Sequence, residues 1–191
     1  MTSSLDQPVR QFLDQVAART PAPGGGGAAA LTAALAAALV AMAARFSAAQ
    51  LPGAGDLAGA ADQLRHRAAE LVDEDAQAYG SVLDAFALPR QDEGRGARIR
   101  SALERAAAIP QEMTEIAARV AEMAAQLAAA GNPNLRGDSV SAAFLAEASA
   151  RSAACLVDIN VALGGLGDGL ARRAADALSV AQAAARQATD G

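Results

Sequence analysis

Apolar residues recur every three to four positions along most of the chain, and clusters of proline and glycine divide this pattern into segments. The pattern predicts helices over residues 5–19, 25–50, 56–88, 97–130, 138–163 and 170–188. Strand-like alternation and internal repeats are both missing from the sequence. We therefore expect one all-α domain over residues 1–191, an Ala-rich bundle of about six helices.

Several residues predict where these helices begin, bend and end. Asp56 is a candidate cap for the third helix. Pro110 removes a backbone donor inside the fourth helix, so a kink or break is expected near Ile109. The segment from Gly131 to Gly137 is predicted to be a loop, with the fifth helix starting at Asp138 or the residue after it.

The apolar residues are mostly alanine, which bears on how the helices pack. Apolar residues make up 52% of the chain and aromatic residues only 3%, so the core is built from Ala, Leu and Val. The stretch 28–44 is uncharged and almost long enough to span a membrane, but alanine is weakly hydrophobic, so a buried central helix is favoured. Its apolar circumference exceeds what one small bundle covers, which predicts a homodimer.

Charge and cysteine content narrow the partners and the compartment. The net charge is −5, and a duplex-binding surface needs clustered cations, so we expect no nucleic-acid partner and no membrane anchor. All 16 cations are Arg, which excludes Schiff-base chemistry on lysine. The single Cys155 has no intrachain partner, and residues 1–19 lack the apolar core of a signal peptide. A cytoplasmic location is expected.

One carboxylate interrupts the apolar stripe of the third predicted helix. Steps of three and four residues place on this stripe Ala61, Leu64, Ala68, Val72, Asp75, Tyr79, Val82 and Phe86. Asp75 should therefore point inward, where a carboxylate must be paired, hydrogen-bonded or protonated. This favours an acid/base or cation-binding role; the alternative is a structural carboxylate that caps a neighbouring helix or pairs with an Arg.

Other chemistry-bearing residues are less promising. His66 falls on the opposite, charged face of the same helix, so we expect it to be exposed and not catalytic. Cys155 is expected to be a small core residue. The chain has no Cys pair, no His pair and no dense carboxylate cluster, which predicts no metal site.

Two loops precede predicted helix starts, where free backbone amides attract negative groups. The first, Pro21 to Gly27, is glycine-rich and would let a flat ligand reach the backbone, although a plain turn explains it equally well. The second, Gly131 to Ser139, gathers two Asn, an Arg and an Asp. Asp138 is a candidate ligand contact there, or simply an N-cap.

Together these segments resemble the formiminotransferase-cyclodeaminase superfamily, specifically its cyclodeaminase domain and the methenyltetrahydrofolate cyclohydrolases similar to it. The resemblance rests on the order and spacing of the proline- and glycine-rich loop 20–26, the Ala-rich stretch 31–44, the segment 73–79 and the Gly-Asn-Pro-Asn loop with Asp138. The sequence departs from the family pattern at Gly27, Gly137 and Leu156.

The resemblance implies an all-helical homodimer that binds reduced folate in a cleft and acts at the carbon held between N5 and N10. Asp75 is then the expected catalytic residue, with no cofactor beyond the folate substrate. The expected substrate-binding residues are Pro23, Gly24, Gly25, Gly26, Asn132, Asn134, Arg136, Asp138 and Asn160.

Three functions remain open at this point. Hydrolysis of methenyltetrahydrofolate to 10-formyltetrahydrofolate is favoured, because no formiminotransferase domain is attached to supply a formimino substrate. Ammonia release from formiminotetrahydrofolate is the second. A non-catalytic folate-binding or assembly protein is the third.

Overall fold

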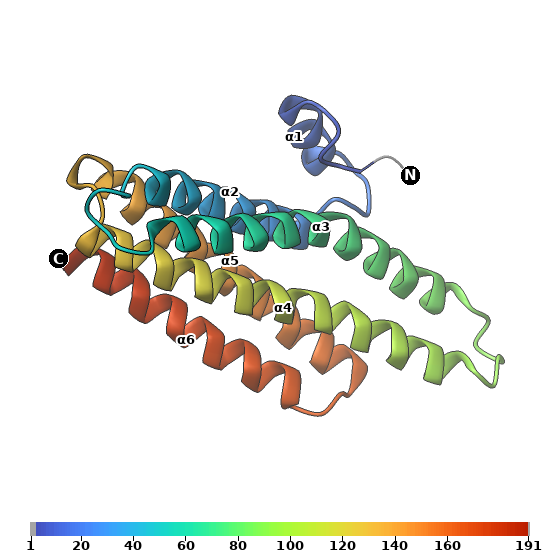
Figure 1. The fold of residues 1–191 in the computed structure, drawn as a ribbon. Helices are drawn as coiled ribbons and strands as arrows, with labels where there is room; N and C mark the ends of the chain where they lie inside the picture. The colour runs from blue at the N-terminus through green and yellow to red at the C-terminus, as the bar shows by residue number, and fades with distance from the viewer. Residues whose placement is uncertain (1–2, 191) are drawn as a thin grey trace.

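Six α-helices form the structure, a computed structural model that describes residues 3–190. Five long helices make the bundle: α2 (Gly25–Arg45), α3 (Ala54–Ala87), α4 (Arg95–Ala130), α5 (Arg136–Gly164) and α6 (Gly169–Asp190). They alternate in direction along the chain, and the short α1 (Val9–Ala17) lies outside the bundle, with its buried Phe12 belonging to the same core cluster (Figure 1). No strand occurs within these described residues, so the predicted all-α bundle is confirmed.

Helix α2 is the core of the bundle. It packs against α3, α4 and α5, and its alanines from Ala29 to Ala44 are mostly buried. Small side chains let neighbouring backbones approach closely. At one such approach the Ser149 hydroxyl of α5 donates a 2.8 Å hydrogen bond to the Ala29 carbonyl. The prediction of a buried central helix is confirmed.

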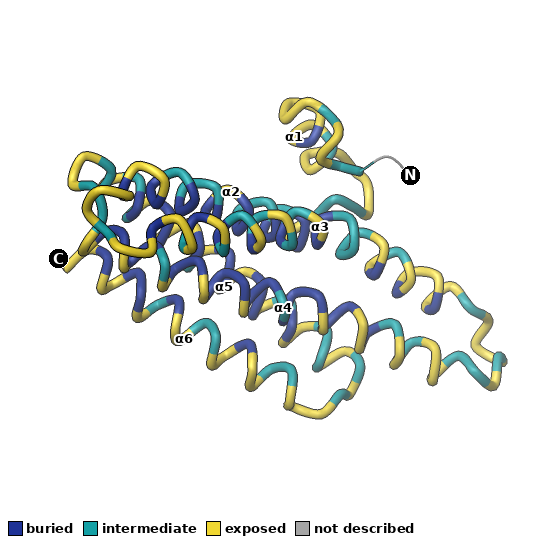
Figure 2. Tube along the Cα trace, viewed as in Figure 1, coloured by how far each residue is buried: buried dark blue, intermediate teal, exposed yellow. Residues whose placement is uncertain are grey.

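Two stretches are long and apolar enough to span a membrane by composition alone. They are α2 and the segment Pro133–Gly164, which includes the 3-10 turn η1 (Pro133–Leu135) and α5. In the bundle, 61% of the most apolar window of α2 is buried, against 44% for the second segment. Figure 2 shows the same concentration of burial around α2, α4 and α5. The burial of α2 is that of a core helix.

Two predicted helix starts are wrong, for local reasons. The first helix begins at Val9 rather than Leu5, because Pro8 occupies its N-cap and the residue before a proline is biased away from helical geometry. The third helix begins at Ala54, two residues before Asp56. Its N-cap is Gly53, whose φ of +81° is the left-handed conformation that glycine adopts at little cost.

Of the kink or break predicted near Ile109, the break does not occur, because α4 continues from Arg95 to Ala130 with Pro110 buried inside it. The predicted loop after α4 is shorter than expected. Its non-helical part is Gly131 and Asn132, where the Asn132 side chain accepts a 3.0 Å hydrogen bond from a backbone amide of η1. Because α5 follows η1 directly, Asp138 lies in its first turn and is not its N-cap.

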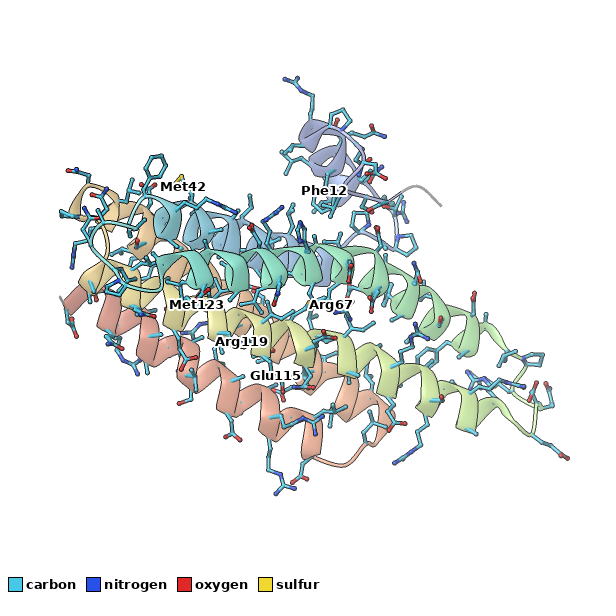
Figure 3. The ribbon with its side chains drawn as sticks, viewed as in Figure 1. Phe12, Met42, Arg67, Glu115, Arg119 and Met123 are labelled. Carbon is cyan, nitrogen blue, oxygen red and sulfur yellow. The ribbon has the colours of Figure 1, made fainter. Side chains whose placement is uncertain are left out.

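Charged side chains join α3 to α4 on the outer surface. Arg67 donates to Glu112 at 2.6 and 2.9 Å and also binds Glu70 and Glu74, and these carboxylates raise its pKa. Figure 3 labels Arg67 together with Glu115 and Arg119 on the neighbouring stretch of α4. His66 is exposed beside this network, as predicted.

Helix α2 is shorter than α3 and α4, so one end of the bundle lacks it. Helix α2 has 21 residues, whereas α3 has 34 and α4 has 36. The first turn of α2 lies beside Asp75, in the middle of α3. Beyond that point α3 and α4 extend without α2 next to them, as Figure 1 shows. The missing length of helix leaves room for a cavity.

Candidate active site

A cavity of about 540 Å³ lies where α2 begins, between α3, α4 and α5. Its lining residues come from the loop before α2 and from one face of each of the other three helices. They are Pro21, Ala22, Gly24, Gly25, Gly26, Asp75, Tyr79, Val82, Leu83, Phe86, Leu103, Ala106, Leu156, Ile159, Asn160 and Leu163. This volume is typical of a pocket for a small organic molecule.

The Asp75 carboxylate is the only charged side chain among these lining residues. It lies directly over Gly26 in the first turn of α2, so a Cβ atom at that position would overlap both carboxylate oxygens. The backbone N–H of Gly27 donates a hydrogen bond to the carboxylate. Asp75 thus points inward, as predicted, and occupies the positively polarised end of α2, where unpaired amides and the helix dipole favour an anion.

Two opposing effects act on the Asp75 carboxyl group. Burial raises its pKa, because removing water disfavours the charged form, and the hydrogen bond from the Gly27 N–H opposes that rise. The net pKa lies above the ordinary value of 3.8. A carboxylate held in this way can stabilise a cation and accept a proton.

The walls of the cavity are mainly apolar. Tyr79 and Phe86, on the same stripe of α3 as Asp75, are 45% and 44% exposed because no part of α2 covers them. Ile159 and Leu163 of α5 line the same cavity. The apolar stripe predicted that all of these α3 side chains are interior. The stripe residues from Ala61 to Val72 are buried in the core, whereas those from Asp75 to Phe86 line the cavity.

The glycine-rich loop contributes backbone rather than side chains. Gly24 and Gly25 line the cavity and have open space where a Cβ atom would stand, whereas Gly26 is held against Asp75. Pro23 belongs to the same segment but is not a lining residue. Asn160, one helical turn after Leu156 on α5, does line the cavity. The structure therefore brings Asp75, Asn160 and the three glycines together.

The loop with the two asparagines lies at the opposite end of the bundle. Asn132 donates through its backbone to the Ser47 hydroxyl at 2.9 Å and through its side chain to the Phe46 carbonyl at 3.1 Å. Both partners follow the C-terminus of α2, while the cavity lies at its N-terminus. Asn132 and Asn134 are therefore not part of the cavity within one chain.

Arg136 and Asp138 are located at that same opposite end. The Arg136 guanidinium donates to the Thr189 carbonyl at 3.2 Å, which satisfies an acceptor at the C-terminus of α6. Asp138 lies in the first turn of α5, where a negative charge favours the helix. Each therefore has a local structural explanation, and the role predicted for both in folate binding stays a prediction.

The alternating directions of the helices predict that these residues lie far from the glycine loop. Helices joined by short loops run up and down in turn, so the loop before α5 falls at the end where α2 finishes. The sequence did not point to most of the apolar lining residues, among them Leu103 and Ala106 of α4, Leu83 of α3 and Ile159 of α5. Their side chains are apolar and carry no signal that distinguishes a cavity wall from a core.

Comparison with known proteins agrees with this architecture. The family model of formiminotransferase-cyclodeaminase matches residues 8–166. The chain belongs to this family. The matched residues include every helix that lines the cavity, since the match begins before α1 and ends just after α5.

Three known proteins are similar to this chain over most of its length. The methenyltetrahydrofolate cyclohydrolase of Methylorubrum extorquens is 32% identical over 165 residues, covering 81% of this chain and 79% of that protein. The mouse formimidoyltransferase-cyclodeaminase is 31% identical over 146 residues, which is 71% of this chain but only 27% of the mouse protein. The crystal structure of formiminotetrahydrofolate cyclodeaminase from Thermotoga maritima superposes with a TM-score of 0.86 at 25% identity, covering 96% and 94% of the two chains.

Alanine at Gly26 tests whether the Asp75 carboxylate needs the space of the missing side chain. We expect Gly26→Ala to lower the free energy of unfolding by about 1–3 kcal/mol, as overpacking does. Gly25→Ala is the matched control and should be neutral or stabilising by up to about 1 kcal/mol, because its Cβ meets open space. Urea unfolding measures both. Equal effects at the two positions would contradict the close contact.

The raised pKa of Asp75 predicts a pH dependence of stability. The folded protein holds this proton more tightly than the unfolded chain, whose pKa is about 3.8, so the group costs stability as pH rises through that value to the folded pKa. Asp75→Asn removes this cost. The variant should therefore melt above the wild type at pH 7, and the gap should close below about pH 4. A gap that stays constant across this range of thermal scans would contradict the raised pKa.

Proposed function

We propose that the protein is a methenyltetrahydrofolate cyclohydrolase, which hydrolyses 5,10-methenyltetrahydrofolate to 10-formyltetrahydrofolate. The observation that carries the proposal is the position of Asp75, a partly buried carboxylate held at the start of α2 inside a mainly apolar cavity. The relative from Methylorubrum extorquens supports this reaction, since it bears that name and is matched over most of both chains.

The chemistry of the substrate suits such a carboxylate. The methenyl carbon between N5 and N10 belongs to an amidinium-like cation, and an anion in a low-dielectric cavity stabilises that charge. The apolar walls, with Tyr79 and Phe86 on one side, accommodate flat rings. The cavity thus provides one negative charge for the one positive charge of the methenyl bridge.

The proposed reaction uses Asp75 as a general base and acid. Water adds to the methenyl carbon while Asp75 accepts one of its protons, giving a neutral adduct with a hydroxyl on the carbon between N5 and N10. The C–N5 bond then breaks, N5 takes the proton from Asp75, and the hydroxyl proton leaves to solvent as the formyl group forms on N10. One water is consumed and one proton is released.

Ammonia release from formiminotetrahydrofolate is the second candidate. It is favoured by the similarity to the Thermotoga maritima cyclodeaminase, which extends over nearly the whole of both chains. The two reactions share the one-carbon bridge between N5 and N10, so the same carboxylate serves either. Purified protein offered each substrate separates them: loss of methenyltetrahydrofolate absorbance indicates hydrolysis, ammonia from formiminotetrahydrofolate indicates deamination, and folate binding without turnover indicates the non-catalytic alternative.

We further propose that two copies associate through the outer face of α2 and α5. Large apolar side chains are exposed there, including Leu35 at 54% and Phe144 at 49%, with Phe46 at 64% near the end of α2. A shallow groove of small residues between the same helices runs on from the cavity, sharing Gly25 and Leu156 with it. Exposed apolar faces of this kind mark interfaces.

We propose a cytoplasmic enzyme without a metal or organic cofactor, acting on reduced folate alone, with no nucleic-acid or membrane partner. The acidic net charge of −5 and the single exposed cysteine support the location and the partners. The exposure of Cys155 corrects the expectation that it is a core residue.

Asp75→Asn tests the catalytic assignment. The amide keeps the size of the side chain but has no negative charge and no titratable proton, so turnover of methenyltetrahydrofolate should fall by about two to four orders of magnitude. Asp84→Asn, on an exposed position of the same helix, and His66→Gln are the controls and should stay within a few-fold of the wild type. Full activity of Asp75→Asn, or a comparable loss in either control, would refute the role of Asp75.

The dimer is tested by molar mass. Light scattering should report about twice the chain mass of 19.0 kDa at micromolar concentration. Leu35→Glu should shift the protein toward monomer, because it places a charge in the apolar face. Val180→Glu, at an exposed apolar position of α6, should leave the mass unchanged. A wild-type protein that is monomeric would overturn the proposal.

A further inference from the structure

Pro110 leaves an unpaired acceptor inside α4. A proline nitrogen carries no hydrogen, so the carbonyl four residues earlier, that of Ala106, lacks its helical partner. Both residues are buried, and a buried carbonyl without a donor is costly. The helix nevertheless continues through Pro110. Some other group must therefore satisfy the Ala106 carbonyl.

That group is the side chain of Asn160 on α5. Its Nδ2 atom donates to the Ala106 carbonyl at 2.8 Å. A carbonyl accepts hydrogen bonds and never donates them, so this contact requires the nitrogen of the amide, and not its oxygen, to face α4. The orientation of the Asn160 amide is thereby determined by the vacancy that Pro110 creates.

The amide oxygen of Asn160 is left for the cavity. It accepts no hydrogen bond from the residues that the structure describes, and it is not among their buried atoms without a partner, so it remains accessible. Asn160 and Ala106 both line the cavity that holds Asp75. The accessible oxygen therefore belongs to a residue that lines the proposed substrate site.

We infer that Asn160 is a specificity-determining residue that offers a fixed acceptor to an N–H group of the ligand, and that Pro110 is the positioning residue that fixes it. The inference rests on the proposed function, in which the ligand is a reduced pteridine with amino and ring N–H donors. A free asparagine would turn its amide to suit donors or acceptors alike. The Asn160 amide can accept only from ligands that present a donor, because turning the amide would set its oxygen against the Ala106 carbonyl.

A double-mutant cycle tests both residues, with affinity for 5-formyltetrahydrofolate measured by calorimetry. Asn160→Ala should weaken binding about 10- to 100-fold, because the ligand donor is left without a partner. Pro110→Ala restores a backbone N–H for the Ala106 carbonyl and should weaken binding about 3- to 10-fold. The double variant should bind no more weakly than Asn160→Ala alone, since Pro110 acts through Asn160.

Stability separates positioning from damage to the fold. Pro110→Ala should raise the melting temperature while it lowers affinity, because alanine is the better helix former. Pro52→Ala, at an exposed turn at the far end of the bundle, is the control and should leave affinity unchanged. Should Asn160→Ala fail to fold, Asn160→Gln keeps the amide but moves it by one methylene, and the same loss of affinity is expected.

The outcomes distinguish this inference from the function on which it rests. A wild-type protein that binds no reduced folate refutes the proposed function. A wild-type protein that binds, together with an Asn160→Ala variant of equal affinity, refutes the role of Asn160 alone. Equal weakening by Pro110→Ala in the presence and absence of Asn160 refutes the positioning role of Pro110.

Discussion

The contact between the Asp75 carboxylate and Gly26 is the constraint on which the site depends. The carboxylate fills the place where any other residue at position 26 would carry its side chain, so α2 can begin beside the middle of α3 only with glycine there. The same contact brings the Gly27 amide to the carboxylate. Helix packing, the location of the negative charge and the hydrogen bond that holds it are thus consequences of one close approach.

The cavity follows from that approach because α2 starts where the carboxylate lies. Beyond this point α3, α4 and α5 have no fourth helix between them, and their apolar side chains line an opening instead of a core. Placing one carboxylate in such an opening costs desolvation energy, which the helix dipole and one hydrogen bond offset only in part. The raised pKa of Asp75 reflects the part of the desolvation cost that is not offset. A cationic ligand would recover that cost, which is why the geometry suits a methenyl bridge.

Much of this arrangement was predictable from residue patterns. Asp75 interrupts a helical apolar stripe, and that position alone indicated an inward carboxylate. The glycine-rich loop predicted the start of a helix. Periodicity does not indicate which helices pack against each other, so the contact between Gly26 and Asp75 was not predicted. Asn132 and Asn134 were grouped with the site on resemblance, although the alternation of helix directions places their loop at the other end of the bundle.

Pro110 shows why local rules failed at one position. Proline costs a helix about 3 kcal/mol because it removes a donor and crowds the preceding turn, which favoured a break. The break does not occur because α4 is packed along its length and because a side chain from another helix satisfies the Ala106 carbonyl. That partner, Asn160, lies 54 residues away in sequence. No local pattern contains a contact of that kind, and only the packing of α5 against α4 reveals it.

The central claim is that the one-carbon bridge of a reduced folate lies against Asp75. A crystal structure of the protein with bound 5-formyltetrahydrofolate tests it most directly. We predict that the formyl carbon on N5 is found about 3–3.5 Å from an Asp75 carboxylate oxygen, inside the cavity at the start of α2. Folate bound elsewhere, for example at the loop around Asn132 with the Asp75 cavity empty, would contradict it.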